Sequence, residues 1–137
     1  MATWLMKSEP ESFSWSDLAR DGKTAWDGVR NHQAANYLRA MKRGDKALFY
    51  HSGAERAVVG MMTVSGEHRP DPSDPSGRFV MVEMRPLKAA KRPLTLAEIK
   101  SESRFKDLLL VRHSRLSVMP VGAAHWALLC RLAGFEP

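Results

Sequence analysis

The sequence predicts a single α+β domain in which a curved sheet or small barrel is flanked by helices. At least four segments rich in β-forming residues alternate with short amphipathic stretches, and no internal repeat is visible. With 137 residues, of which 44% are hydrophobic, the chain is long enough to bury a core without disulfide bonds. We therefore expect residues 1–137 to fold as one domain.

The composition narrows the classes of function. A net charge of +6 favours a polyanionic partner, although a basic surface that meets only solvent explains the charge equally well. Cys130 is the only cysteine, which argues against disulfides and thiolate metal clusters and for a reducing compartment. Residues 1–10 do not resemble a signal peptide, and no apolar run approaches the roughly 20 residues that span a bilayer. We expect a cytoplasmic protein without a membrane partner.

The first elements are a strand and a short helix. Residues 3–6 are predicted as the strand, and the turn that follows is closed by Pro10. Ser14 or Ser16 can cap a helix that stops at Asp21 and Gly22.

The second helix is predicted from its cap and its periodicity. Asn31 is a good N-cap, and Gly44 is expected to end the helix. Between them, apolar side chains recur every three or four residues on one face, namely Ala34, Tyr37, Leu38 and Met41. Two strands rich in β-forming residues follow, over residues 47–50 and 57–64.

The second half begins with a loop. Residues 70–77 (PDPSDPSG) are predicted to form a solvated loop at the end of a long hairpin, because they contain three prolines and two aspartates. Apolar and polar side chains then alternate over residues 78–87, which predicts a strand.

The remaining elements are mostly helical. Thr95 and Glu98 fit a capping box for a helix that runs to Lys100. Ser103 is a candidate cap for another short helix. Residues 112–120 are expected to be extended chain or strand ending at a proline, and residues 122–133 are expected to form the last helix.

Catalytic chemistry has little support in the sequence. The five histidines show no metal-ligand spacing, and no nucleophile elbow or glycine-rich phosphate loop is present. A triad that combines His51 with Ser8 or Ser52 stays open, because triads form in space. An enzyme acting on a nucleotide or small amide, with Glu9 or His51 as acid/base, is the alternative reading. We expect a non-enzymatic protein with no metal and no cofactor.

Trp26 is the aromatic residue best suited to recognition. The other three tryptophans are interpreted as core or helix-packing residues, whereas Trp26 lies in a polar segment with Arg30 and Asn31. An aromatic ring in such a segment can stack on a planar ligand while its neighbours read the ligand's edge. Asn31 has a competing role as a helix cap, and Arg30 meets either a phosphate or solvent.

Two more polar clusters can contribute to binding. Lys7, Ser8 and Glu9 lie where the first strand meets a turn, and Glu9 can accept a hydrogen bond from an exocyclic amino group. On composition alone, an ordinary surface turn is the simpler reading. Arg112 and Arg115 with Ser117 can meet a phosphate backbone, or they form a solvated basic loop.

Five motifs carry a resemblance that covers the chain essentially from end to end. They are WLMKSEP at residues 4–10, WDGVRNHQA at 26–34, LFYHS at 48–52, Val59-Gly60, and SRLSVMPV at 114–121. In this order and at this spacing they resemble the EVE domain family, and specifically its small bacterial-type single-domain members. Several of the motifs are seven or more residues long, so the resemblance is specific.

This resemblance implies a PUA-like fold, a curved β-barrel with flanking helices that is related to the YTH and ASCH domains. It implies binding of a modified base, modified cytosine or adenine, in DNA or RNA. The YTH domain is similar in placing a Lys-Ser turn after its first strand and a tryptophan before its first long helix. The base would be flipped or single-stranded, because a pocket of this kind cannot enclose a stacked base.

The expected site follows from the resemblance together with the clusters. The base-binding pocket would comprise Lys7, Ser8, Glu9, Trp26, Val29, Asn31, Tyr50, His51 and Ser52. The phosphate backbone would be met by Arg30, Arg112, Arg115 and Ser117. Many family members carry arginine where this chain has Ala35, so one phosphate contact is expected to be missing.

Overall fold

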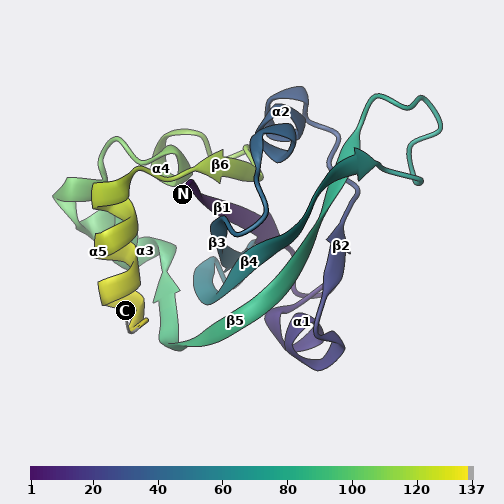
Figure 1. Ribbon diagram of the computed structural model, residues 1–137. Helices are drawn as coiled ribbons and strands as arrows, with labels where there is room; N and C mark the ends of the chain where they lie inside the picture. The colour runs from purple at the N-terminus through teal and green to yellow at the C-terminus, as the bar shows by residue number, and fades with distance from the viewer. Residues whose placement is uncertain (136–137) are drawn as a thin grey trace.

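Within residues 1–135, which the computed structural model describes, six strands form one mixed sheet that curls into a half-barrel (Figure 1). The strands are β1 (Thr3–Ser8), β2 (Thr24–Trp26), β3 (Lys46–His51), β4 (Ala57–Pro70), β5 (Val80–Thr95) and β6 (Val118–Pro120). Their order in the sheet is β2-β5-β4-β3-β1-β6. β1 and β3 run parallel, and the other neighbouring strands are antiparallel.

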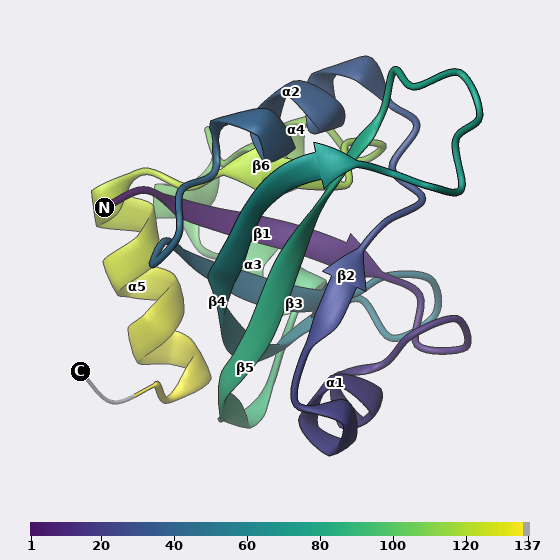
Figure 2. The same cartoon turned by 45° about the vertical axis from the view of Figure 1, so that its right-hand side comes forward.

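Helices flank this sheet on its ends and its open side. They are α1 (Trp15–Asp21), α2 (His32–Ala40), α3 (Leu96–Ser101), the 3-10 helix η1 (Ser103–Phe105), α4 (Leu109–Arg112) and α5 (Ala123–Ala133). Figure 2 shows α1 below β2 and α5 on the opposite side of the molecule from β2. No helix in the described part of the chain is long and apolar enough to cross a membrane.

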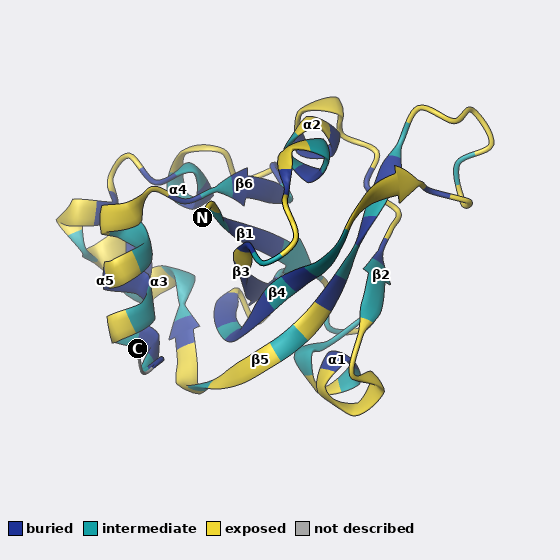
Figure 3. Ribbon diagram, viewed as in Figure 1, coloured by how far each residue is buried: buried dark blue, intermediate teal, exposed yellow. Residues whose placement is uncertain are grey.

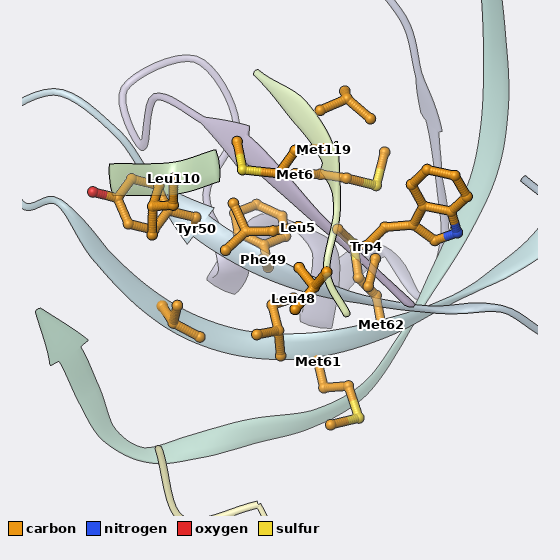
Figure 4. Packing of buried hydrophobic residues seen from close by; sticks show 14 of the residues in the cluster. Trp4, Leu5, Met6, Leu48, Phe49, Tyr50, Met61, Met62, Leu110 and Met119 are labelled. Carbon is orange, nitrogen blue, oxygen red and sulfur yellow. The ribbon is translucent and has the colours of Figure 1, made fainter. Parts of the chain in front are cut away.

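The core lies around β1 and β3, the two central parallel strands. Their apolar runs are buried on both faces, which explains why they do not alternate with polar residues (Figure 3). Figure 4 shows Leu5, Phe49 and Met119 among the side chains that pack there. Trp4 is buried as expected, and its Nε1 donates to Asp45 Oδ2 at 3.1 Å, so this buried carboxylate is paired.

Three predicted helix caps, Ser14, Asn31 and Thr95, are confirmed. Ser14 caps α1 in a capping box with Asp17, and Thr95 caps α3 in a second box with Glu98. Asn31 Oδ1 accepts from the third residue of α2 at 2.9 Å. These short polar side chains satisfy helix amides that would otherwise lack a partner.

Several predicted boundaries are wrong. α2 ends at Ala40 because Met41 adopts an extended conformation, and Gly44 lies in the turn before β3. η1 is capped by Glu102 rather than Ser103. α4 runs to Arg112, so only the end of the segment predicted as extended forms a strand, at β6.

The β4–β5 hairpin is much longer than predicted. β4 continues six residues past Val64, and β5 continues to Thr95 although Pro86 and Pro93 interrupt its pattern. Residues 65–70 of β4 and 85–93 of β5 are largely exposed, and each stretch is ordered by pairing with a mostly buried part of the other strand. Four register shifts absorb the irregular residues. The sequence carries no apolar alternation there.

β2 was not predicted, and the placement of Trp26 in a polar turn is wrong. Trp26 is the last residue of β2 and pairs with Val82 of β5. The strand is three residues long and has one buried residue, which is too short for a period to appear.

Candidate functional site

The ends of β1 and β2 converge on one side of the half-barrel (Figure 2). A cavity of about 470 Å³ is lined by residues of these strand ends and of the loops that follow them. Its wall comes from β1, the loop before α1, β2, the loop before α2 and the residue before β6. The lining residues are Lys7, Ser8, Ser12, Phe13, Thr24, Ala25, Trp26, Asp27, Gly28, Val29, Arg30 and Ser117. Six of these were predicted as site residues, four for the base and two, Arg30 and Ser117, for the phosphate backbone.

Lys7 and Ser8 form the β1 side of this cavity. Lys7 Nζ donates to the carbonyl oxygen of Ser114 at 2.9 Å and lies 5.8 Å from the ring centroid of Tyr50. Partial burial lowers the pKa of Lys7. An ammonium has three donors, so the fixed Lys7 head group has further hydrogens to offer. Ser8 Oγ donates to the carbonyl of Phe13 at 2.6 Å and therefore presents lone pairs as an acceptor.

Two aromatic rings line the cavity and both pack on Phe49. The Trp26 ring lies 5.4 Å from Phe49 at 79°, and the Phe13 ring lies 6.4 Å from it. Trp26 is only 7% exposed. It is therefore a fixed wall of the cavity and part of the core, in contrast to the exposed stacking platform that the sequence suggested.

The loop at residues 27–30 is held by a carboxylate from the β4–β5 hairpin. Asp71 Oδ2 accepts from the amide of Gly28 at 2.8 Å and from Arg30 Nη1 at 3.1 Å. Arg30 Nη2 also donates to Ser73 Oγ at 2.9 Å, and the guanidinium lies 5.3 Å from the ring centroid of Phe79. Gly28 has φ +75°, a conformation that favours glycine. Arg30 thus braces the cavity wall from the side.

Asp71 is shielded from water and fully paired. Burial alone would raise the pKa of Asp71, but hydrogen bonds from Ser73, the Gly28 amide and Arg30 outweigh it and lower the pKa to about 2. The carboxylate therefore stays ionised at neutral pH. The loop predicted to be merely solvated carries the group that fixes one wall of the cavity.

The same loop contains a second, matching turn. Asp71 Oδ1 accepts from the amide and hydroxyl of Ser73, and Asp74 Oδ1 accepts from the amide and hydroxyl of Ser76. Each Asp-Pro-Ser triplet is thus an Asx turn. Only the first reaches the cavity wall: Asp74 Oδ2 accepts from the amides of Arg78 and Phe79 within the hairpin.

Asp27 is a site residue that was not predicted from the sequence. It is exposed, and it is the only acidic residue among the twelve that line the cavity. Glu9, the carboxylate that was predicted there, is exposed outside the wall, and its backbone carbonyl accepts from the amides of Ser12 and Phe13. Asp27 directly follows Trp26, and this adjacency was the only signal for it in the sequence.

His51 lies behind the wall and is 8% exposed. Its Nε2 accepts from the amide of Trp15 at 3.0 Å, so the proton resides on Nδ1, which donates to Glu55 Oε1 at 2.6 Å. Both ring nitrogens are therefore engaged in tying β3 to α1 and to the following turn.

The neighbours of His51 also lie behind the cavity. Tyr50 is buried, and this burial raises its pKa to about 12, although Arg56 opposes the shift. The amide of Ser52 donates to the carbonyl of Ser8 at 2.9 Å. Tyr50, His51 and Ser52 thus support the residues of β1 and α1 and are not part of the lining.

A shallower hollow of about 350 Å³ adjoins the cavity and holds three more predicted residues. Asn31, Arg112 and Arg115 line it, together with Gln33, His113, Ser114 and Leu116. No acidic residue is among these seven. Arg30 and Ser117, which line the cavity, directly precede and follow residues of the hollow in the chain, so the two depressions share a border.

Ala35 is a fully buried residue of α2, so this position faces the protein interior. The loss of a phosphate contact at this position stays a prediction. Among residues 1–135, no group of three or more His, Cys, Asp or Glu side chains is arranged to hold a metal ion.

The curled mixed sheet with flanking helices is the fold of PUA-like domains. The YTH domain of MmI1 shares it at a TM-score of 0.62 and 16% identity over 98% of this chain and 96% of that one, a likeness of fold alone. Residues 2–132 match the EVE domain, and the chain belongs to this family. The predicted family and fold are thereby confirmed.

The relatives of the chain include both bacterial and human proteins. It is 37% identical to human thymocyte nuclear protein 1 over 98% of this chain and 75% of that protein. The structure of Rpa0253 from Rhodopseudomonas palustris matches at a TM-score of 0.93 and 45% identity, covering 100% of this chain and 97% of that one. The crystal structure of human THYN1 in complex with 5-methylcytosine-containing DNA matches at a TM-score of 0.93 and 36% identity, covering 100% of both chains.

Proposed function

We propose that this chain binds a modified base of DNA or RNA in the cavity between β1 and β2 and releases it unchanged. The observation that carries the proposal is the cavity wall, in which two aromatic rings, one carboxylate and one ammonium lie together. Its volume of about 470 Å³ falls in the range of small-ligand sites. The end-to-end similarity to human THYN1, a protein with a solved complex with methylcytosine DNA, supports a nucleic acid as the partner.

The polar groups of the wall favour a base with an exocyclic amine. An ionised carboxylate such as that of Asp27 can only accept hydrogen bonds, and Ser8 Oγ presents lone pairs, so both suit the amino group of cytosine or adenine. Lys7 supplies a donor for a ring nitrogen or carbonyl. Thymine or uracil would turn a carbonyl toward Asp27 and leave it unpaired, which costs binding free energy. We therefore propose a modified cytosine or adenine as the guest.

The base has to leave its stack to enter. Extrusion from a duplex costs a few kcal/mol, and less for a strand that is already single. The basic hollow beside the cavity would offset part of this cost, because Arg112 and Arg115 are exposed there and can meet phosphates. Arg30 would act mainly through its contact with Asp71.

An enzyme that uses Glu9 or His51 has less support. Neither residue lines the cavity, and both ring nitrogens of His51 are hydrogen-bonded inside the fold. Product formation from a modified oligonucleotide would favour the enzyme.

A binding screen tests the proposal. Oligonucleotides of DNA and RNA, single- and double-stranded, would carry cytosine, 5-methylcytosine, adenine, N6-methyladenine or thymine and be titrated at two salt concentrations. We expect one modified cytosine or adenine to bind better than its unmodified form. Asp27→Asn should weaken that preference at least about tenfold, because it removes a charged hydrogen bond. Asp107→Asn, an equal charge change at an exposed site outside the cavity, should not. Equal affinity for all oligonucleotides would refute the proposal.

A further inference from the structure

A second cavity, of about 550 Å³, lies between α5 and the strands β3, β4 and β5. It shares no lining residue with the cavity between β1 and β2. Figure 1 shows α5 on the far side of the molecule from β2. The walls of this second cavity include Met61 from β4, Trp126 from α5 and Phe135 just beyond α5. A concave site of this size with aromatic and aliphatic walls is typical of small-molecule binding.

The polar groups of this second cavity are all basic. Lys46, Lys88 and Arg131 line it, and among the nine lining residues that the structure describes none is acidic. Cys130 lies in the same wall and is partly buried. Burial raises the pKa of this thiol, while Lys88 and Lys46 act in the opposite direction. Lys46 from β3 and Arg131 from α5 thus place two positive charges in the same wall as the apolar side chains, where the acidic group of a ligand would meet them.

The apolar walls are recessed and do not form a flat surface patch. Among the described residues, Met1 and Leu87 are the only large hydrophobic residues that are exposed. Docking of a protein partner generally requires a contiguous exposed apolar patch of several hundred Å². A molecule small enough to enter the cavity needs no such patch.

We infer that this cavity binds a small amphipathic anion, a carboxylate or sulfonate with an aromatic or aliphatic body. The body would lie against Trp126, Met61 and Phe135, and the acidic group would face Lys46 and Arg131. This inference does not depend on the proposed base binding, because the two cavities lie on different elements.

The anionic dye 8-anilinonaphthalene-1-sulfonate is a suitable probe for this site. Its fluorescence rises in apolar surroundings, and its neutral analogue N-phenyl-1-naphthylamine lacks the sulfonate. On the folded full-length protein we expect one saturable site for the dye and weaker binding of the analogue. A modified oligonucleotide at saturation should not displace the dye. Displacement, or the absence of saturable binding, would overturn the inference.

Two variants locate the site. Ala127 is an exposed residue of α5 that lines the cavity, so Ala127→Leu should fill it and weaken dye binding about tenfold. Ala123→Leu, on the same helix outside this cavity, is the control. Lys46→Gln should weaken the affinity for the dye about threefold and leave the affinity for the neutral analogue unchanged. Lys106→Gln should change neither affinity. Unchanged dye binding in Ala127→Leu and Lys46→Gln would refute the assignment.

Discussion

Replacement of Asp71 by alanine tests how the cavity wall is held in place. This carboxylate accepts hydrogen bonds from Gly28, Arg30 and Ser73, and its side chain is 0% exposed. Asp71→Ala removes all of these bonds at once and leaves the Gly28 amide without its partner. The loop at residues 27–30 should then lose its fixed position, and with it the orientation of Asp27 and Trp26.

The cost of Asp71→Ala can be estimated in two ways. A pKa of about 2 instead of 3.8 corresponds to about 2 kcal/mol of stability at neutral pH. A hydrogen bond to a charged group contributes about 1.5–3 kcal/mol. The carboxylate is not exposed, but it lies in the loop between β4 and β5 and not in the core, so the effective dielectric constant around it is above that of a deep core. We expect a loss of about 2–3 kcal/mol, which a domain of ordinary stability tolerates.

The second Asx turn of the same loop, at Asp74, provides a matched control. Asp74→Ala removes the same residue type from the same Asp-Pro-Ser context, yet Asp74 makes no contact with the cavity wall. Urea denaturation gives the stability of each variant, and fluorescence anisotropy gives its affinity for modified and unmodified oligonucleotides. We expect Asp71→Ala to lose the preference for the modified base and Asp74→Ala to keep it.

A double-mutant cycle assigns the effect to the pair. Arg30→Ala should lower the free energy of unfolding by much of the amount that Asp71→Ala does. The combined variant should lose about 1–2 kcal/mol less than the sum of the two single losses. If Asp71→Ala and Asp74→Ala discriminate bases equally well, or if Arg30→Ala and Asp71→Ala are additive, the bracing role of Asp71 is wrong.

Four other variants or conditions give further predictions. Trp26→Ala should cost about 3–5 kcal/mol in urea denaturation, because the ring is part of the core, whereas Trp26→Phe should retain base preference. Arg112→Gln with Arg115→Gln should reduce the slope of log affinity against log salt by about 2 without changing base preference in anisotropy titrations. His51→Ala should lower stability by about 1–3 kcal/mol but keep base preference. The stabilisation by Asp71 is complete above about pH 4 and is lost as the pH falls toward 2, because its folded pKa is depressed. Asp74, Glu98 and Glu102 titrate in the same range, so acid titrations monitored by circular dichroism should show a smaller loss of stability in Asp71→Ala than in the wild type.

Local signals in the sequence predicted the elements that depend on local chemistry. The buried runs of β1 and β3 are apolar because both faces of these strands are covered, and Ser14, Asn31 and Thr95 cap the helices that follow them. β2 escaped prediction because it is only three residues long, and the exposed stretches of β4 and β5, residues 65–70 and 88–93, escaped it because pairing with distant residues orders them.

Only part of the candidate site could be predicted, because some of its residues are positioned by contacts between distant parts of the chain. Lys7 and Ser8 follow the strand predicted over residues 3–6, whereas Trp26 was singled out by its polar neighbours and by the family resemblance. All three line the cavity. The role of Asp71 depends on a contact across 43 residues with Gly28, and composition alone makes its loop look solvated. Tyr50, His51 and Ser52 lie at the end of β3, close to the site. They do not line the cavity, because His51 and the Ser52 amide form hydrogen bonds that support α1 and β1.

Whether the cavity between β1 and β2 holds an unstacked modified base can be seen in a crystal structure of the protein with the oligonucleotide preferred in the screen. We expect the base inside this cavity against Trp26, with its exocyclic amine toward Asp27 and the flanking phosphates near Arg112 and Arg115. A base that remains stacked in its strand, or that occupies any other part of the surface, would contradict this expectation.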